Sequence, residues 1–416
     1  MYLSGSKWSM QSKRRKWSNP WRIFILLGLI AAAVYFNRIV VPVTSPLFIP
    51  TPTPTRAPES FVNEAQAYFN DGKLSQSIDA YKQAILTDPT NSSNYVNLAR
   101  VQIYAGQYEE ALKNSELALL RNSDNPLAHA TRAWALDFLG NYLEAEAAIK
   151  KALELDANNA VAHAVYAEIL VDLGNYDKAA EESRLAVELS PSSLEVRRAR
   201  GYVLYWTSNY DLALDEYNAA LAINDKIPNL HLMVGYIYTA LGEDDLAVEA
   251  FNQANALNPQ DPTPDYEASR IYFTIGEYAK AAQYAEQAVK DDPTNPGLHG
   301  NLGIMYAKKN EFDLAIQHLS LAVQGGTNED GDIVGGIPLS YQIRVIEIYS
   351  TYGLTLARQN RCEEAVPIFQ AMLTTVPDNE IAVYNATVGL EICQTNLEAS
   401  EAESEATPTP TPTPTP

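Results

Sequence analysis

From residue 58 onward, small and apolar residues recur along the chain at a fixed period. The stretches LGNYLEAEAAIKKALELDANN (139–159) and LGNYDKAAEESRLAVELSPSS (173–193) show this directly, because each residue of the first lies 34 positions before its counterpart in the second. Such a period predicts an array of stacked structural repeats. A ninth copy fits from residue 346. The first eight copies follow one another without an insertion or deletion and begin at residues 58, 92, 126, 160, 194, 228, 262 and 296.

The residue types within one repeat predict a helical hairpin. Positions 8 and 20 carry small residues in nearly every copy, so that two helices can approach closely there. Position 15 is Gly in six copies, which suits the turn that ends a first helix. Position 17 is often aromatic, and Pro at position 32 stops a second helix in five copies. Each repeat is therefore expected to contribute two helices.

This pattern resembles the tetratricopeptide repeat family, and the resemblance extends from residue 58 to about residue 393. It implies an all-α fold in which helical hairpins stack into a right-handed superhelical solenoid. One hairpin cannot bury its own apolar face, so the interfaces between neighbours stabilise the array. We expect nine repeats over 58–379, a capping helix over 380–397, and a disordered acidic and Thr-Pro tail over 398–416.

The repeat frame slips by 16 positions between the eighth and ninth repeats, and the extra sequence lies near 324–342. Its glycines rule out a simple extension of the helix. Asp330 and Asp332 flank a Gly as in a calcium loop, but the alternating oxygen ligands and the closing Glu of an EF-hand are absent. A tolerated surface insertion is the favoured interpretation, and a lip that contacts a partner is the alternative.

A basic segment (1–19) and an apolar segment precede the repeats. A helix over 20–41 would reach about 33 Å, close to the thickness of a bilayer core. More basic residues precede this helix than follow it closely, which places the N-terminus in the cytoplasm and the repeats outside. We predict a transmembrane signal anchor that makes this a single-pass protein of the cell membrane, followed by a Thr/Pro-rich stalk over 42–57. A signal peptide cleaved near residues 31–33, which would release a secreted protein, is the alternative.

The two cysteines fall at related places in the predicted hairpins. Cys362 begins the second helix of repeat nine, and Cys393 lies near the end of the following helix. Because these helices are expected to pack antiparallel, the two ends meet, and a location outside the cytoplasm permits a disulfide. Two buried thiols are the alternative.

No motif of an enzyme, cofactor or metal site is found. A phosphate-binding loop, a G-x-S-x-G elbow, an H-E-x-x-H pair and a Cys with a supporting His are all absent from the sequence. Four His share position 4 of their repeats, but neighbouring helices lie about 8–10 Å apart and no third ligand is evident, so a structural role is favoured. We predict no catalytic residue, no cofactor and no metal.

The charge balance also excludes one class of partner. Residues 1–57 contain eight Lys or Arg and no acidic residue, which leaves 22 basic against 51 acidic residues in the rest of the chain. An acidic surface repels phosphate groups, so no nucleic acid is expected as a partner. Function is therefore expected to come from a surface that binds another class of molecule.

The concave surface of the solenoid is the expected binding surface. In the tetratricopeptide repeat family it is lined by positions 2, 5, 9, 12 and 13 of each first helix. The basic clamp that some members use for a terminal carboxylate is missing, because Val62, Gln66 and Ala130 stand at such positions. Aromatic and Arg side chains, which dominate binding hot spots, gather there instead. The predicted groove residues are Arg100, Trp134, Phe138, Arg198, Tyr202, Tyr205, Trp206, Tyr236, Tyr266, Arg270 and Phe273.

Two interpretations of these groove residues remain open. The rings either serve as platforms for an extended partner, with arginines that meet acidic groups, or they pack between adjacent first helices. We predict a non-catalytic, membrane-tethered scaffold that binds protein partners outside the cytoplasm. A module that binds a cell-wall or surface glycan is the alternative, as is an accessory subunit of an export or surface-polymer assembly. The oligomeric state is not predicted.

Overall fold

The computed structural model describes residues 19–40 and 56–406. The chain divides into two compact parts after Ala57. The predicted basic N-terminus up to residue 18, most of the predicted stalk (41–55) and the final Thr-Pro alternation (407–416) lie outside the described residues.

The first part contains one apolar helix. α1 (Pro20–Tyr35) continues into a short π-helical segment, η1 (Phe36–Val40). The side chain of Asn19 accepts a hydrogen bond from the backbone N–H of Trp21 at 3.2 Å, which satisfies one of the free donors at the helix start. Within the described residues, Pro20–Ile39 is the one helical stretch whose length and composition suit a membrane crossing.

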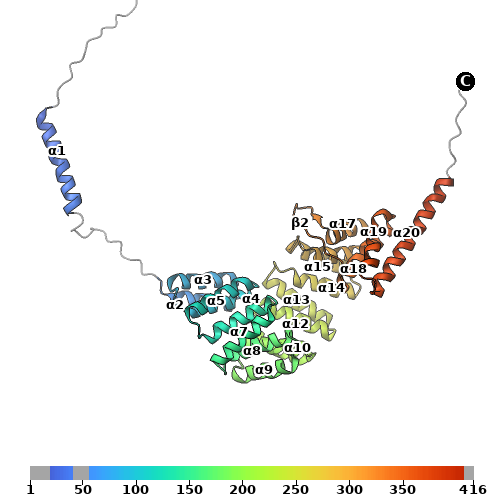
Figure 1. The fold of residues 1–416 in the computed structure, drawn as a ribbon, viewed down its shortest axis with the longest axis horizontal. Helices are drawn as coiled ribbons and strands as arrows, with labels where there is room; N and C mark the ends of the chain where they lie inside the picture. The colour runs from blue at the N-terminus through green and yellow to red at the C-terminus, as the bar shows by residue number, and fades with distance from the viewer. Residues whose placement is uncertain (1–18, 41–55, 407–416) are drawn as a thin grey trace, which may run out of the picture. The chain divides into compact units, whose positions relative to one another are not determined.

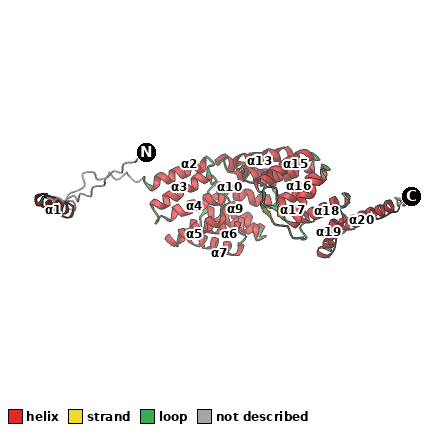
Figure 2. Ribbon diagram, turned by 90° about the horizontal axis from the view of Figure 1, so that it is seen from above, coloured by secondary structure: helices red, strands yellow, loops and turns green. Residues whose placement is uncertain are grey.

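The second part is an array of helical hairpins (Figure 1, Figure 2), which confirms the predicted all-α solenoid. The last hairpin is followed by α20 (Glu380–Ala406). The hairpins, repeats 1 to 9, are α2 (Pro58–Asn70) with α3 (Leu74–Thr87), α4 (Ser92–Tyr104) with α5 (Tyr108–Arg121), α6 (Pro126–Phe138) with α7 (Tyr142–Leu155), α8 (Ala160–Asp172) with α9 (Tyr176–Leu189), α10 (Leu194–Trp206) with α11 (Tyr210–Ile223), α12 (Pro228–Leu241) with α13 (Asp244–Leu257), α14 (Thr263–Thr274) with α15 (Tyr278–Asp291), α16 (Pro296–Lys308) with α17 (Phe312–Gln324), and α18 (Ile343–Arg358) with α19 (Cys362–Thr375).

Left-handed backbone at position 15 ends the first helices. The six glycines at this position have φ between 72° and 85°. The other three repeats place Ser208, Asn310 and Asn360 there, with φ of 59°, 63° and 58°. Gly and Asn tolerate this region better than most residues, so the predicted turn is confirmed.

The two helices of a repeat fit each other through positions 8 and 24. A Cβ on Gly235 would lie 2.4 Å from Cε1 of Phe251, so Gly at position 8 makes room for the aromatic ring at position 24. In repeat 3, Ala133 faces the smaller Ile149, and both are fully buried. Close packing of this kind sets the spacing within each hairpin. The pairing of Gly with a large side chain recurs at Gly201–Tyr217, Gly303–Leu319 and Gly353–Phe369.

Repeats 1 to 6 curl round so that the first repeat contacts the sixth (Figure 1). One apolar cluster combines side chains of repeats 1 and 2 with side chains of repeats 5 and 6. The side-chain amide of Asn224 donates a hydrogen bond to the carbonyl of Phe69 at 3.2 Å, and Lys226 packs against Gly72. We refer to α2–α13 as the closed turn, and its concave face is its interior.

The insertion between repeats 8 and 9 forms a small antiparallel pair, β1 (Gly326–Thr327) with β2 (Ile333–Val334). It packs on the array through the buried Val334 and through Ile337, whose N–H donates to the carbonyl of Ala322 at 2.8 Å. α18 begins at Ile343, before the predicted start at residue 346, with Gln342 in extended conformation before it.

The C-terminal end differs from the prediction in length. α20 extends to Ala406, so the expected start of the disordered tail at residue 398 is wrong. Residues 398–406 are all Glu, Ala or Ser, and Ala and Glu favour a helix, so the capping helix continues. Cys362 and Cys393 form a disulfide between α19 and α20, with their Cα atoms 5.4 Å apart.

Closure of the turn predicts different effects for two chemically identical substitutions. Gly72 and Gly140 have φ of 74° and 76°, so Ala strains both turns by about 1–2 kcal/mol. Only at Gly72 does the new Cβ also meet Lys226, at 2.6 Å from its Cβ. We expect Gly72→Ala to destabilise the chain by about 1–3 kcal/mol more than Gly140→Ala. Denaturation followed by circular dichroism, with amide exchange in residues 224–227, measures the difference, and equal effects would contradict the closure.

The disulfide is expected to stabilise the C-terminal end locally. It closes a loop between residues 31 positions apart, which corresponds to about 3–4 kcal/mol in the chain-entropy model. Cys393→Ser and Cys362→Ser remove the same bond, so both should speed amide exchange in α20 to the same extent and leave α2–α13 unchanged. An alkylation count that does not change on reduction would show that the bond is absent.

Candidate functional site

The concave positions of the array lie in two different environments. In repeats 2 to 5, many of them are inside the closed turn and contact one another. In repeats 7 to 9, they line a cavity that is open to solvent. The residues predicted from the sequence are distributed over both regions.

Trp134 and Arg198 are buried in the interior of the closed turn. Nη2 of Arg198 donates to Oε2 of Glu168 at 2.6 Å, and both side chains are almost inaccessible to solvent. The guanidinium also lies over the Trp134 ring, with Cζ 4.7 Å from the ring centroid. Because this buried ion pair already balances the charge of Arg198, the guanidinium is not free to pair with an acidic partner. The prediction that Trp134 and Arg198 line an open groove is therefore wrong.

Arg100 is held by the same interior. Its Nε lies 3.0 Å from Oε1 of Glu195 on α10, and its Cζ lies 5.6 Å from the ring centroid of Phe69. The Tyr104 ring is 5.4 Å from Phe69 and 5.4 Å, edge-on, from Trp134. These contacts join α2, α4, α6 and α10, so Arg100 helps to hold the turn closed.

Phe138 and Tyr202 also have partners within the chain. The Phe138 ring stacks on Tyr108 with centroids 4.6 Å apart and an interplanar angle of 6°. The hydroxyl of Tyr202 donates to Oδ1 of Asp172 at 2.8 Å. Phe138 nevertheless keeps part of its ring exposed to solvent.

Tyr205 and Trp206 lie at the end of α10. The Tyr205 ring contacts Tyr210 and Trp206, each with centroids 5.8 Å apart. Trp206 also packs edge-on against Tyr202 at 6.1 Å, and about half of its surface stays exposed. Trp134 packs against a ring of the adjacent first helix, as the alternative expected. Phe138, Tyr205 and Trp206 instead contact rings of second helices or of α10 itself, so packing between adjacent first helices describes only part of this set.

The remaining predicted residues lead toward the C-terminal repeats. Tyr236 donates to Oε1 of Glu267 at 3.4 Å, and Nη1 of Arg270 lies 3.3 Å from Oε2 of the same carboxylate. The Arg270 guanidinium also lies 5.7 Å from the Tyr266 ring centroid and is exposed. Phe273, one turn further along α14, borders the open cavity.

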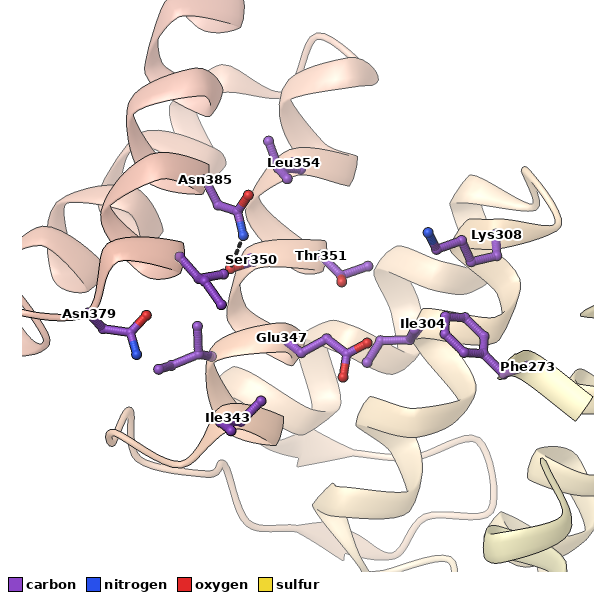
Figure 3. A pocket seen from close by; sticks show the side chains of 12 residues that line it. Phe273, Ile304, Lys308, Ile343, Glu347, Ser350, Thr351, Leu354, Asn379 and Asn385 are labelled. Atoms are coloured by element: carbon purple, nitrogen blue, oxygen red, sulfur yellow. Dashed lines mark hydrogen bonds between the residues drawn. The ribbon is translucent and has the colours of Figure 1, made fainter. Parts of the chain in front are cut away.

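This cavity, the C-terminal groove, has a volume of about 380 Å³ and runs between repeats 7 to 9 and α20 (Figure 3). Figure 3 shows Phe273, Ile304 and Lys308 on one side and Asn379 and Asn385 on the other, with α18 between them. The lining side chains are Phe273, Ile304, Lys308, Ile343, Ile346, Glu347, Ser350, Thr351, Leu354, Asn379, Ile381 and Asn385.

The C-terminal groove combines an aliphatic floor with polar edges. Ile304 and Leu354 occupy position 9 of repeats 8 and 9, the same position as Trp134 in repeat 3. The side-chain amide of Asn385 donates to Oγ of Ser350 at 3.1 Å, which ties α20 to α18. Such a site can take an apolar side chain and can exchange hydrogen bonds with the main chain of a bound segment.

Sequence reasoning identified Phe273 and missed the rest of this groove. The search favoured aromatic and Arg residues, whereas the aliphatic residues at position 9, Ile304 and Leu354, look like ordinary packing residues. The insertion also interrupts the register before repeat 9, and two lining residues, Ile381 and Asn385, come from α20 rather than from a repeat. The available signal was the run of Ile residues that follows the insertion.

The histidines at position 4 have a structural role. In each case Nε2 bonds to the backbone carbonyl of the residue six positions earlier, so the first helix is tied to the loop before it. Within the described residues, no group of three His, Cys, Asp or Glu could hold a metal ion. The four pairs, at 2.9 or 3.0 Å, are His129 with Ser123, His163 with Ala157, His231 with Asp225, and His299 with Pro293.

Comparisons with solved structures identify similar solenoids. The APC/C hetero-tetramer Cut9–Hcn1 is similar to 63% of this chain, with 18% sequence identity and a TM-score of 0.54, and the similarity spans 52% of that chain. A tetratricopeptide repeat protein from Parabacteroides merdae ATCC 43184 is similar to 60% of this chain and spans 98% of its own length, with 18% identity and a TM-score of 0.40. PilW, a type IV pilus biogenesis factor, is similar to 47% of this chain and spans 90% of its own length, with 23% identity and a TM-score of 0.43.

Sequence comparison agrees with the fold. No curated protein matches the chain. Family models described as tetratricopeptide repeat match residues 58–91, 80–113, 139–200, 228–261 and 266–330, which together make up just over half of the chain. The fixed period of the sequence, the stacked hairpins and these matches together show that the chain belongs to the tetratricopeptide repeat family.

Proposed function

We propose that this protein is a non-catalytic scaffold that binds an extended segment of a partner protein in the C-terminal groove. One observation carries the proposal. In repeats 2 to 5, the concave positions are filled by contacts within the chain, whereas in repeats 7 to 9 the corresponding positions line an open apolar groove. In a tetratricopeptide repeat array, the open concave face is the surface on which an extended chain can lie.

The composition of the groove favours a peptide over a glycan. Sugar rings are held by stacking on several aromatic faces, whereas Phe273 is the one aromatic ring among the lining residues. Aliphatic side chains such as Ile304 and Leu354 offer a pocket for an apolar side chain of the partner. Lys308 and Glu347 add one positive and one negative charge, which suits a segment of mixed sequence. A glycan remains the alternative ligand.

We further propose that α1 anchors the protein in a membrane, with the repeats outside the cytoplasm. Its length and apolar composition support this, as does the excess of basic residues before it. The disulfide between Cys362 and Cys393 supports an oxidising compartment for the repeats. The partner is then an envelope protein, such as a component of an export or surface-polymer assembly. Cleavage near residues 31–33, which would release the protein, is the alternative.

Charge introduced at the edge of the groove is expected to abolish peptide binding without unfolding the protein. Ile343 and Ile381 are 79% and 63% exposed, so Glu at both positions should be tolerated by the fold. Peptides selected from a displayed random library on the full-length protein in detergent should bind the double variant Ile343→Glu/Ile381→Glu about 10 to 100 times more weakly.

Leu86 provides the matched control, because it is 74% exposed on α3, far from the groove residues in the repeat order. Leu86→Glu should leave the affinity of the selected peptides unchanged. If the double variant binds them as tightly as the Leu86→Glu protein does, the groove is not the binding surface. Binding of isolated wall polysaccharide, together with failure to select any peptide, would favour the glycan alternative.

A further inference from the structure

A second cavity, of about 240 Å³, lies in the interior of the closed turn and shares no lining residue with the C-terminal groove. Its walls come from α6, α8 and α10, with Asn229 and Met233 contributed by α12 and Tyr217 by α11. The return of repeat 6 toward repeat 1 therefore helps to enclose it. We refer to it as the interior cavity.

The interior cavity contains carboxylate oxygens that lack a hydrogen-bond donor. Asp137 is 6% exposed, and its Oδ1 has no partner among the described residues. Glu168 is 2% exposed, and its Oε1 also lacks a partner there, while its Oε2 accepts from Arg198. Asp172 accepts a hydrogen bond from Tyr202. Arg198 also lines the cavity and is paired with Glu168, so, among the described residues, Asp137 and Asp172 are the two carboxyl groups of the cavity that have no cation paired with them.

Aromatic rings form the rest of its wall. Tyr202 and Tyr217 line its inner part, and Phe138 and Tyr142 line it while remaining partly exposed to solvent. The faces of such rings attract cations, most strongly where water is excluded. Carboxylates combined with aromatic faces are the arrangement that suits an organic cation.

We propose that the interior cavity binds an organic ammonium group, carried either by a free amine or by a lysine side chain. An ammonium can donate hydrogen bonds to Asp137 and Asp172 and supplies the positive charge that balances the pair when Asp137 ionises, and the volume accommodates it with a short aliphatic chain. Arg198 is already paired with Glu168, which leaves the adjacent Asp137 and Asp172 for the ligand. This site is distinct from the peptide groove and does not depend on it.

Proton linkage follows from the same geometry. Burial, together with the nearby carboxylates of Asp172 and Glu168, raises the pKa of Asp137 to about 9, and the positive charge of Arg198 offsets only part of this effect. Asp137 therefore carries a proton at neutral pH when the cavity is empty. The groups that face it from α12, Asn229 and Met233, do not titrate. A bound ammonium favours the ionised carboxylate, so it displaces this proton.

Titration calorimetry of the full-length protein with butylammonium chloride tests the proposal. We expect binding that releases about one proton at pH 7, seen as heats that depend on the ionisation enthalpy of the buffer, and an affinity that rises with pH by up to about tenfold per unit below pH 9. Butan-1-ol, which has the same chain without the charge, should not bind. A pentapeptide with a central lysine distinguishes the sources, because its binding indicates a lysine side chain and its failure indicates a free amine.

Asp137→Asn should lower butylammonium affinity at least tenfold and abolish proton release. The fold should tolerate this change, because residue 137 is already uncharged when the cavity is empty. Asp265→Asn is the control, because Asp265 is also a buried carboxyl group but lines no part of the cavity. The proposal is overturned if neither probe binds the wild type, if butan-1-ol binds as tightly as butylammonium, or if Asp137→Asn matches Asp265→Asn. Proton release by the wild type needs no variant, so the test holds even if a variant fails to fold.

Discussion

The contact between repeat 1 and the loop that joins α11 to α12 determines how the rest of this molecule is organised. Because Asn224 and Lys226 pack against the turn after α2, the concave face of repeats 1 to 6 becomes an interior. Side chains on that face must then satisfy one another, as Arg198 does with Glu168. Repeats 7 to 9 are not enclosed in this way, so a groove stays open there.

The local structure was predictable from the sequence because its causes lie within a single repeat. Gly72 and Gly140 mark turns, and Gly235 opposite Phe251 sets the distance between paired helices. Closure was not predictable, because it sums small rotations over several repeats, and each repeat looks the same whether the array is open or closed. Arg100 and Glu195 meet across 95 positions, and no local pattern connects them. Trp134 and Arg198 were placed on an open surface for this reason.

The insertion and α20 give the C-terminal repeats a different character. The insertion packs on repeat 8 through Ile337, and α20 contributes Ile381 and Asn385 to the groove. The end of the array therefore presents a surface that no single repeat encodes. The first six repeats enclose an acidic, aromatic cavity, while the last three present an apolar groove, so one repeat type produces two chemically different sites.

Side-chain oxidation by hydroxyl radicals, read by mass spectrometry, tests the closed turn most directly. Trp134 and Trp206 occupy concave positions of repeats 3 and 5, and their exposed fractions are 1% and 51%. Comparing two residues of one type in one sample removes differences in intrinsic reactivity. The closed turn predicts rapid oxidation of Trp206 and almost none of Trp134 in the native protein, with equal rates after denaturation. Equal rates in the native protein would show an open solenoid and contradict the account.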